Sequence, residues 1–109
     1  MTFQLGSALL DACVLAVLSN GDTYGYVLTQ QVRAVIDVSE SALYPVLRRL
    51  QKDGSLATYD QPYQGRNRRY YRITDRGQDR LREYREEWQS YKKRVDLILS
   101  EEAQEHDQG

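Results

Sequence analysis

Cysteine, histidine and proline are scarce in this sequence, which has one cysteine, one histidine and two prolines among 109 residues. A single cysteine excludes an internal disulfide bond. Because Cys13 lies in an apolar stretch, we interpret it as a small core residue, with a reactive thiol as the alternative. Few prolines together with 28% charged residues are typical of a helix-rich soluble protein.

Long apolar runs are also missing, because no stretch approaches the roughly 18 apolar residues that a membrane-spanning helix needs. No basic segment followed by an apolar one opens the chain, so a secretory leader is not indicated. The sequence therefore predicts a cytoplasmic protein that has no membrane partner.

The usual signatures of enzymes are missing as well. The only histidine, His106, lies in the polar C-terminal end, and Cys13 has no neighbouring partner in the sequence. No P-loop, no glycine-rich dinucleotide turn and no cluster of metal ligands occurs. Because catalysis needs a nucleophile with a base, a carboxylate pair or a metal, we expect neither an enzyme nor a cofactor nor a metal site.

Apolar periodicity and turn residues divide the chain into four helices and one hairpin. The expected helices cover residues 7–19, 24–35, 39–54 and 75–102, and the expected strands cover residues 56–60 and 69–73 around a polar loop. Asp22 or Thr23 is the expected cap of the second helix, which is expected to bury Val35. Leu56, Tyr71 and Ile73 are expected to anchor the hairpin on the helices.

The third helix has one apolar face and one polar face. Ser39 is its expected cap and Gly54 its expected end, and Leu43, Val46, Leu47 and Leu50 form the inner face. Pro45 removes one backbone hydrogen bond inside this helix and is expected to bend it. The outward side chains are then those of Glu40, Ser41, Tyr44 and Arg48.

Positive charge is concentrated between Arg48 and Arg82, where ten basic residues stand against four acidic ones. This segment has a net charge of +6, and the rest of the chain has −7. Nine of the ten basic residues are arginine, whose guanidinium group suits bidentate contacts with phosphate and guanine. The alternative is a solvated surface without a partner, which is the usual fate of a run of charges.

A helix followed by an arginine-tipped hairpin predicts a winged helix-turn-helix that binds double-stranded DNA, with the second helix of the motif in the major groove. Phosphate contacts would fix the position, and contacts with base edges would select the sequence. The predicted DNA-binding residues are Ser41, Tyr44, Arg48, Arg49, Arg66, Arg68, Arg69 and Tyr70. The alternative is a winged-helix adaptor that binds an acidic protein surface and no DNA.

The last helix has apolar residues three and four positions apart, which is the spacing of a coiled-coil seam. These residues are Leu81, Tyr84, Trp88, Tyr91, Val95 and Ile98. A helix of about 28 residues is about 42 Å long, which is more than a single small domain covers. The pattern therefore predicts a homodimer whose interface is this seam, with the first helix joining it.

The motif combination of the chain closely resembles the PadR family of transcriptional regulators. The resemblance is carried by the segment from Leu43 to Leu50, by Gly54, by the segment from Gly65 to Gly77 and by the segment from Gly21 to Tyr26. It implies a winged helix-turn-helix homodimer that is usually a repressor of an inverted-repeat operator and is released by a small molecule. Pro45 is common at this position in the family.

The single C-terminal helix resembles the short-tailed branch of the family, which includes multidrug-binding members. This resemblance implies that Trp88 stacks against a planar aromatic effector, with Tyr84, Leu15, Ala8 and Leu5 as candidate walls. The alternative is that Trp88 only packs in the interface and that Tyr84 and Tyr91 fill the cavity.

The expected organisation is thus a mainly α (α+β) protein in three parts. Residues 1–74 form a winged helix-turn-helix domain with a two-stranded wing, residues 75–102 form a dimerisation helix, and residues 103–109 form a disordered tail.

Overall fold

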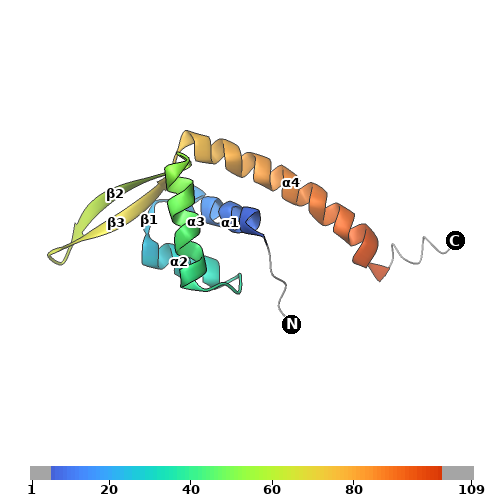
Figure 1. The fold of residues 1–109 in the computed structure, drawn as a ribbon, viewed down its shortest axis with the longest axis horizontal. Coiled ribbons are helices and arrows are strands. Elements are labelled where there is room, and N and C mark those ends of the chain that lie inside the picture. Colours follow the sequence, from blue (N-terminus) through green and yellow to red (C-terminus); the bar gives the residue numbers. More distant parts are fainter. Residues whose placement is uncertain (1–5, 102–109) are drawn as a thin grey trace.

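The computed structural model describes residues 6–101, so Leu5 and the predicted tail at residues 103–109 lie outside the described residues (Figure 1). The elements follow one another as α1 (Ser7–Ser19), β1 (Thr23–Tyr24), α2 (Gly25–Arg33), α3 (Glu40–Lys52), β2 (Leu56–Tyr63), β3 (Arg66–Ile73) and α4 (Asp75–Leu99). The predicted winged helix-turn-helix with a long C-terminal helix is confirmed.

A single apolar core joins the first three helices to the base of the sheet and the start of α4. The fully buried apolar side chains are Val14, Leu15, Leu18, Leu28, Val32, Leu43, Val46, Leu47, Leu50, Leu56 and Leu81. Tyr71 and Ile73 pack against this cluster from β3, as predicted. Burial of this apolar surface is the main term that holds the helices together.

The ends of α3 are fixed by its own sequence. The Ser39 hydroxyl accepts a hydrogen bond from the backbone N–H of Ala42 at 3.2 Å, which is an N-cap. At the other end the Ser55 N–H bonds to the Leu50 carbonyl while Gly54 adopts a φ of +85°. This arrangement is a Schellman motif, which glycine favours because it tolerates positive φ. Both predicted ends of this helix are confirmed.

The sheet has three antiparallel strands in the order β1-β3-β2, one more than predicted. Thr23–Tyr24 forms the extra strand β1 by pairing with Tyr71 and Tyr70. Asp22 and Thr23 therefore do not cap α2, and the hydroxyl of Tyr59 donates to the Asp22 carboxylate at 2.8 Å instead.

The wing is longer than predicted, because residues 61–63 and 66–68 are paired strands rather than a loop. Only Gln64 and Gly65 form the turn, with φ values of +50° and +78°. Two successive positive φ angles are the mark of a type I′ hairpin turn, whose twist matches that of the strands. Pro62 is tolerated because β2 is an edge strand.

Helix α2 ends at Arg33, earlier than predicted. Val35 is 82% exposed, so the prediction that it belongs to the buried stripe was wrong. The chain needs residues 34–39 to turn from α2 into α3, and Ile36 and Val38 supply the apolar contacts of that turn.

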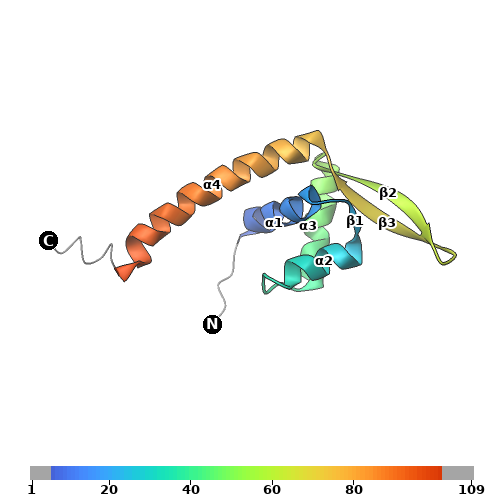
Figure 2. The same ribbon diagram turned by 180° about the vertical axis from the view of Figure 1, so that it is seen from behind.

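Helix α4 and the wing extend from the helical domain in opposite directions, as the two views show (Figures 1 and 2). The 25 residues of α4 span about 37 Å. Leu81 in its second turn is only 2% exposed and belongs to the core of this chain. The prediction that Leu81 lies in a dimer interface is therefore corrected, because its surface is already covered within the monomer.

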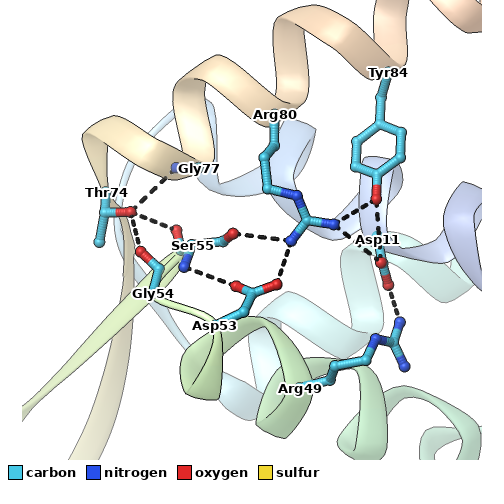
Figure 3. Close-up of polar contacts among 9 residues, drawn as sticks. All are labelled: Asp11, Arg49, Asp53, Gly54, Ser55, Thr74, Gly77, Arg80 and Tyr84. Carbon is cyan, nitrogen blue, oxygen red and sulfur yellow. Dashed lines mark hydrogen bonds and ion pairs between the residues drawn. The ribbon is translucent and has the colours of Figure 1, made fainter.

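Polar contacts attach the first turns of α4 to the rest of the domain (Figure 3). The Arg80 guanidinium bonds to Asp53, to the Ser55 hydroxyl at 3.0 Å and to the Tyr84 hydroxyl at 2.6 Å. Burial acts to raise the pKa of Asp53, but hydrogen bonds from Ser55 and the charge of Arg80 bring that pKa below its usual value. Arg80 therefore connects α4 with the end of α3 and the start of β2.

Candidate nucleic-acid interface

The outer face of α3 is polar and uncovered. Ser41, Tyr44 and Arg48 are all exposed, Tyr44 to 39%, and lie on one side of the helix at spacings of three and four residues. The opposite face is anchored in the core by Leu43, Leu47 and other apolar residues. Because the core fixes the rotation of the helix, these three side chains are held outward together.

Arg69 on β3 belongs to the same surface. It lies on the sheet face of Tyr71 and Ile73, the face that packs against the helices. Burial raises the pKa of Tyr71, Arg69 and Arg48 act to lower it, and Tyr44 acts to raise it. Tyr44, Arg48 and Arg69 are therefore all within electrostatic range of this tyrosine. We call Ser41, Tyr44, Arg48 and Arg69 the reading face.

Three other predicted wing residues lie on the opposite face of the sheet. Side chains alternate along a strand, so Arg66, Arg68 and Tyr70 point away from the face of Arg69. The Arg68 guanidinium carbon lies 3.5 Å from the ring centre of Tyr63 and 4.3 Å from that of Tyr24. The structure thus separates Arg68 and Tyr70 from the reading face, while Arg66 is exposed beside the hairpin turn.

Arg49 does not extend from the reading face. Its guanidinium pairs with the carboxylate of Asp11 on α1, which is only 5% exposed (Figure 3). Arg49 follows Arg48 by one residue, which is about 100° around a helix of 3.6 residues per turn, and this rotation turns it toward α1. Arg49 thus ties α3 to α1, and its contact with DNA stays a prediction.

A cleft of about 590 Å³ lies between α1 and α4. Among the predicted effector residues, Ala8, Tyr84 and Trp88 line it together with Tyr91, and Leu5 lies outside the described residues. Leu15 is 0% exposed in the core and does not line the cleft, so its predicted role as a wall was wrong. The other lining residues are Gly6, Leu9, Ala12, Glu87, Ser90 and Arg94.

Tyr84 connects this cleft to the polar cluster at the base of α4. Its hydroxyl donates to Asp11 at 3.3 Å and accepts from Arg80 at 2.6 Å (Figure 3). Burial and the neighbouring Asp11 raise the pKa of Tyr84, which keeps the hydroxyl protonated and able to donate. The Tyr84 side chain therefore lines the cleft, and the hydrogen bonds of its hydroxyl with Asp11 and Arg80 hold it in place.

The remaining seam residues of α4 are largely exposed in the single chain. Trp88 is 42%, Tyr91 59% and Ile98 69% exposed, and Val95 is partly buried. Leu97 and Leu99 add further exposed apolar surface near the end of the helix. A contiguous apolar stripe of this kind is characteristic of a surface that another molecule covers.

Asp11 and Arg80 are structural members of the site region that sequence reasoning missed. Asp11 was hidden among the apolar residues of α1, and a lone carboxylate in an apolar helix is the signal that could have identified it. Arg80 was counted only as one charge of the basic segment. No sequence pattern indicated that it pairs with Asp53 and Asp11.

Within residues 6–101 no helix combines the length and the apolar character that crossing a bilayer demands.

Comparison with known proteins matches residues 14–83 to the model of the transcriptional regulator PadR-like family. An uncharacterized protein of Lysinibacillus sphaericus is 34% identical over 95 residues, which is 83% of this chain and 87% of that protein. A transcriptional regulator of Mycobacterium tuberculosis is 38% identical over 73 residues, which is 66% of this chain and 68% of that protein.

Solved structures show the same arrangement. The protein smu.1704 of Streptococcus mutans is 39% identical with a TM-score of 0.84, covering 93% of this chain and 95% of its own. A PadR family transcription regulator of Clostridium difficile is 29% identical with a TM-score of 0.77, covering 84% of this chain and 98% of its own. The winged domain, the long terminal helix and the matched sequence agree, and the chain belongs to the PadR-like family of transcriptional regulators.

Proposed function

We propose that the protein is a cytoplasmic homodimeric repressor that binds an inverted-repeat operator and is released by a planar aromatic effector. In this proposal α3 enters the major groove, where the exposed Ser41 and Tyr44 face the bases and Arg48 faces base edges or phosphate. Arg69 approaches the backbone from the wing, and Arg66 lies at its tip.

The observation that carries the proposal is the reading face. Arg48 on the exposed side of α3 and Arg69 on the sheet face that packs against the helices are both exposed, and the charges of both act on Tyr71. Within residues 6–101 Arg48 and Arg69 form no ion pair of the kind that Arg49 and Arg80 make, although Asp60 stands opposite Arg69 in the sheet. Exposed guanidinium groups without an ion pair on a polar surface favour a polyanionic partner.

Replacing Arg48 with alanine is expected to weaken DNA binding by about tenfold to a hundredfold, because one contact with phosphate or guanine is lost. The measurement is fluorescence anisotropy with the duplex that lies upstream of its own gene. Arg85→Ala is the matched control, since it removes an exposed arginine from α4 and leaves the reading face intact. Equal affinities of the Arg48 and Arg85 variants would contradict the contact of Arg48 with DNA, and no binding by the unaltered protein would favour the winged-helix adaptor.

The proposed dimer rests on the exposed side of α4. Its apolar residues from Trp88 to Ile98 keep a spacing of three and four, and the helix extends beyond the domain that anchors it. A second copy of the same helix covers such a stripe in a coiled-coil geometry. Pairing also gives two copies of α3 the fixed separation that an inverted repeat requires.

The proposed effector occupies the cleft between α1 and α4. Trp88 and Tyr91 lie 6.4 Å apart with their rings inclined at 35°, and both line the cleft. Flat aromatic compounds stack on such rings, and Glu87 and Arg94 supply charged groups at the walls. The volume of about 590 Å³ is within the range of small-molecule sites.

Trp88 is the only tryptophan, so its fluorescence reports directly on the cleft. Titration with planar aromatic cations and phenols is expected to quench this emission saturably, because a stacked ligand contacts the indole. Ala8→Phe, which fills the cleft from the opposite wall without adding a second tryptophan, is expected to abolish the saturable part of the quenching of Trp88. If no compound of either class quenches saturably, the effector part of the proposal is contradicted.

A further inference from the structure

Four tyrosines and one arginine form a continuous stack along the sheet face opposite to Arg69. In spatial order they are Tyr63, Arg68, Tyr24, Tyr70 and Tyr59. The Arg68 guanidinium lies between the rings of Tyr63 and Tyr24, and the ring of Tyr70 lies 5.7 Å from that of Tyr24 and 5.5 Å from that of Tyr59. We call these five residues the wing stack.

The wing stack connects the outer part of the hairpin with the domain. Tyr63 pairs with Arg66 in the last register position before the turn, while Tyr24 belongs to β1 at the start of α2. Tyr59 donates its hydroxyl to Asp22 at 2.8 Å, which fixes the inner end. Arg68 on β3 therefore contacts Tyr24 of β1 on one side and Tyr63 near the tip of the wing on the other.

The outer hairpin has little else to hold it. Both strands are exposed beyond Asp60 apart from Arg68, and the wing extends away from the helices (Figures 1 and 2). Two-stranded hairpins are marginally stable in water, so a wing without helices behind it needs another source of order. The contacts within the wing stack supply this order, because cation–π contacts such as those of the Arg68 guanidinium persist at exposed sites.

We infer that Arg68 is a positioning residue for DNA binding. This inference rests on the proposed function. The wing stack holds the hairpin and with it Arg69, which lies on the other sheet face, the one that packs against the helices. The Arg68 guanidinium itself stays between tyrosine rings instead of contacting phosphate. Arginine suits this task because its planar guanidinium stacks on aromatic faces, whereas lysine has only a compact ammonium.

The inference is tested with Arg68→Gln, Tyr63→Ala and Arg69→Gln, using anisotropy of a labelled duplex from upstream of its own gene at several salt concentrations. Arg68→Gln and Tyr63→Ala are each expected to lower affinity about fivefold, because the wing is less ordered. The slope of log K against log salt is expected to stay at the wild-type value in both. Arg69→Gln is expected to reduce that slope by about one, since it removes one phosphate contact.

Amide hydrogen exchange of residues 59–70 provides the second measurement. Arg68→Gln and Tyr63→Ala are expected to accelerate exchange in this hairpin, and Arg69→Gln to leave it unchanged. The double variant of Arg68 and Tyr63 is expected to lose less affinity than the two single losses combined, because the two side chains share one contact. Tyr63→Phe keeps the aromatic ring and is expected to retain both the affinity and the slow exchange of the unaltered protein.

Two results would overturn the inference while the proposed function stands. One is a slope that falls by about one in Arg68→Gln, which would make Arg68 a phosphate contact. The other is unchanged affinity and exchange in Tyr63→Ala. Failure of the proposed function is a separate result, namely no binding of the duplex by the unaltered protein, and it would remove the inference with it.

Discussion

Replacing Gly77 with alanine is expected to lower the free energy of unfolding by about 3 kcal/mol, the upper end of what overpacking usually costs. Gly77 lies in the first turn of α4 and is buried. A Cβ atom at this position would lie 2.3 Å from the Ser55 carbonyl oxygen and 2.7 Å from a side-chain carbon of Ile73. Ser55 directly precedes β2, so its backbone oxygen cannot move aside without displacing the start of that strand.

The Ser55 carbonyl oxygen also takes part in hydrogen bonds that fix the start of α4. It accepts hydrogen bonds from the Thr74 N–H and the Thr74 hydroxyl, both at 3.0 Å, and the same hydroxyl accepts from the Gly77 N–H (Figure 3). Displacing Ser55 would therefore break the cap of α4 together with the junction of the wing. The effect of Gly77→Ala includes lost hydrogen bonds as well as a steric clash.

Urea unfolding measures the effect of Gly77→Ala, with Gly25→Ala as the matched control. The comparison separates the steric clash at Gly77 from the general effect of replacing a helical glycine. Gly25 is also in the first turn of a helix, but its added Cβ would meet only Tyr71 at an ordinary 3.6 Å. We expect Gly25→Ala to change the free energy of unfolding by less than about 1 kcal/mol, because alanine is the better helix former. Equal midpoints for the two variants would contradict the close approach at Gly77.

Replacing Asp11 with alanine is expected to destabilise the protein by about 3 kcal/mol, because it leaves the Arg49 guanidinium without its acidic partner and removes one of the two acidic partners of Arg80. The Asp11 side chain is 7% exposed and meets Arg49, Arg80 at 3.7 Å and the Tyr84 hydroxyl at 3.3 Å. These partners come from α3 and α4. The Asp11 carboxylate thus joins α1, α3 and α4. Without it, the guanidinium groups of Arg49 and Arg80 would lie near each other with like charge.

Thermal unfolding measures this effect, with Glu40→Ala as the matched control. Glu40 forms an ion pair with Arg33 at 3.4 Å, but both side chains are about 40% exposed. An exposed pair contributes at most about 1 kcal/mol, so the control is expected to change stability little. Asp11→Asn, which keeps the shape and some hydrogen bonds, is expected to fall between alanine and the unaltered protein. Similar losses in Asp11→Ala and Glu40→Ala would contradict a buried three-helix junction.

The sequence predicted those parts of the fold that depend on local signals. Ser39 and Thr74 were identified as caps because their hydroxyls precede helical periodicity, and both accept the expected backbone N–H groups. Leu43, Leu47 and Leu50 were assigned to the core by their spacing. The outward position of Ser41, Tyr44 and Arg48 follows from the same periodicity, so three of the four residues of the reading face were available from the pattern of this helix alone.

The errors concern residues whose positions depend on distant parts of the chain. Strand β1 has only two residues and forms because β3 offers an edge, which no local pattern shows. Arg49 and Arg80 were grouped with surface charge because the carboxylate of Asp11 lies 38 residues before Arg49. Leu81 fitted the heptad of α4 equally well as a core or an interface residue, and only tertiary packing decided it.

The division of the wing into two faces was also hidden, although its cause is simple. Because residues 61–68 were predicted to form a loop, the alternation of Arg66 and Arg68 against Arg69 could not be applied. Pro62 and Gly65 suggested that loop, yet one occupies an edge strand and the other a two-residue turn.

Hydroxyl-radical footprinting of the DNA upstream of its own gene tests most directly whether this molecule is a dimeric DNA-reading protein. The account predicts two protected patches on one side of the duplex, centred about 34 Å apart or at a multiple of that distance, as two copies of α3 in successive major grooves require. It also predicts that both patches disappear together in Arg48→Ala. Protection of a single patch, or the same footprint after Arg48 is removed, would contradict it.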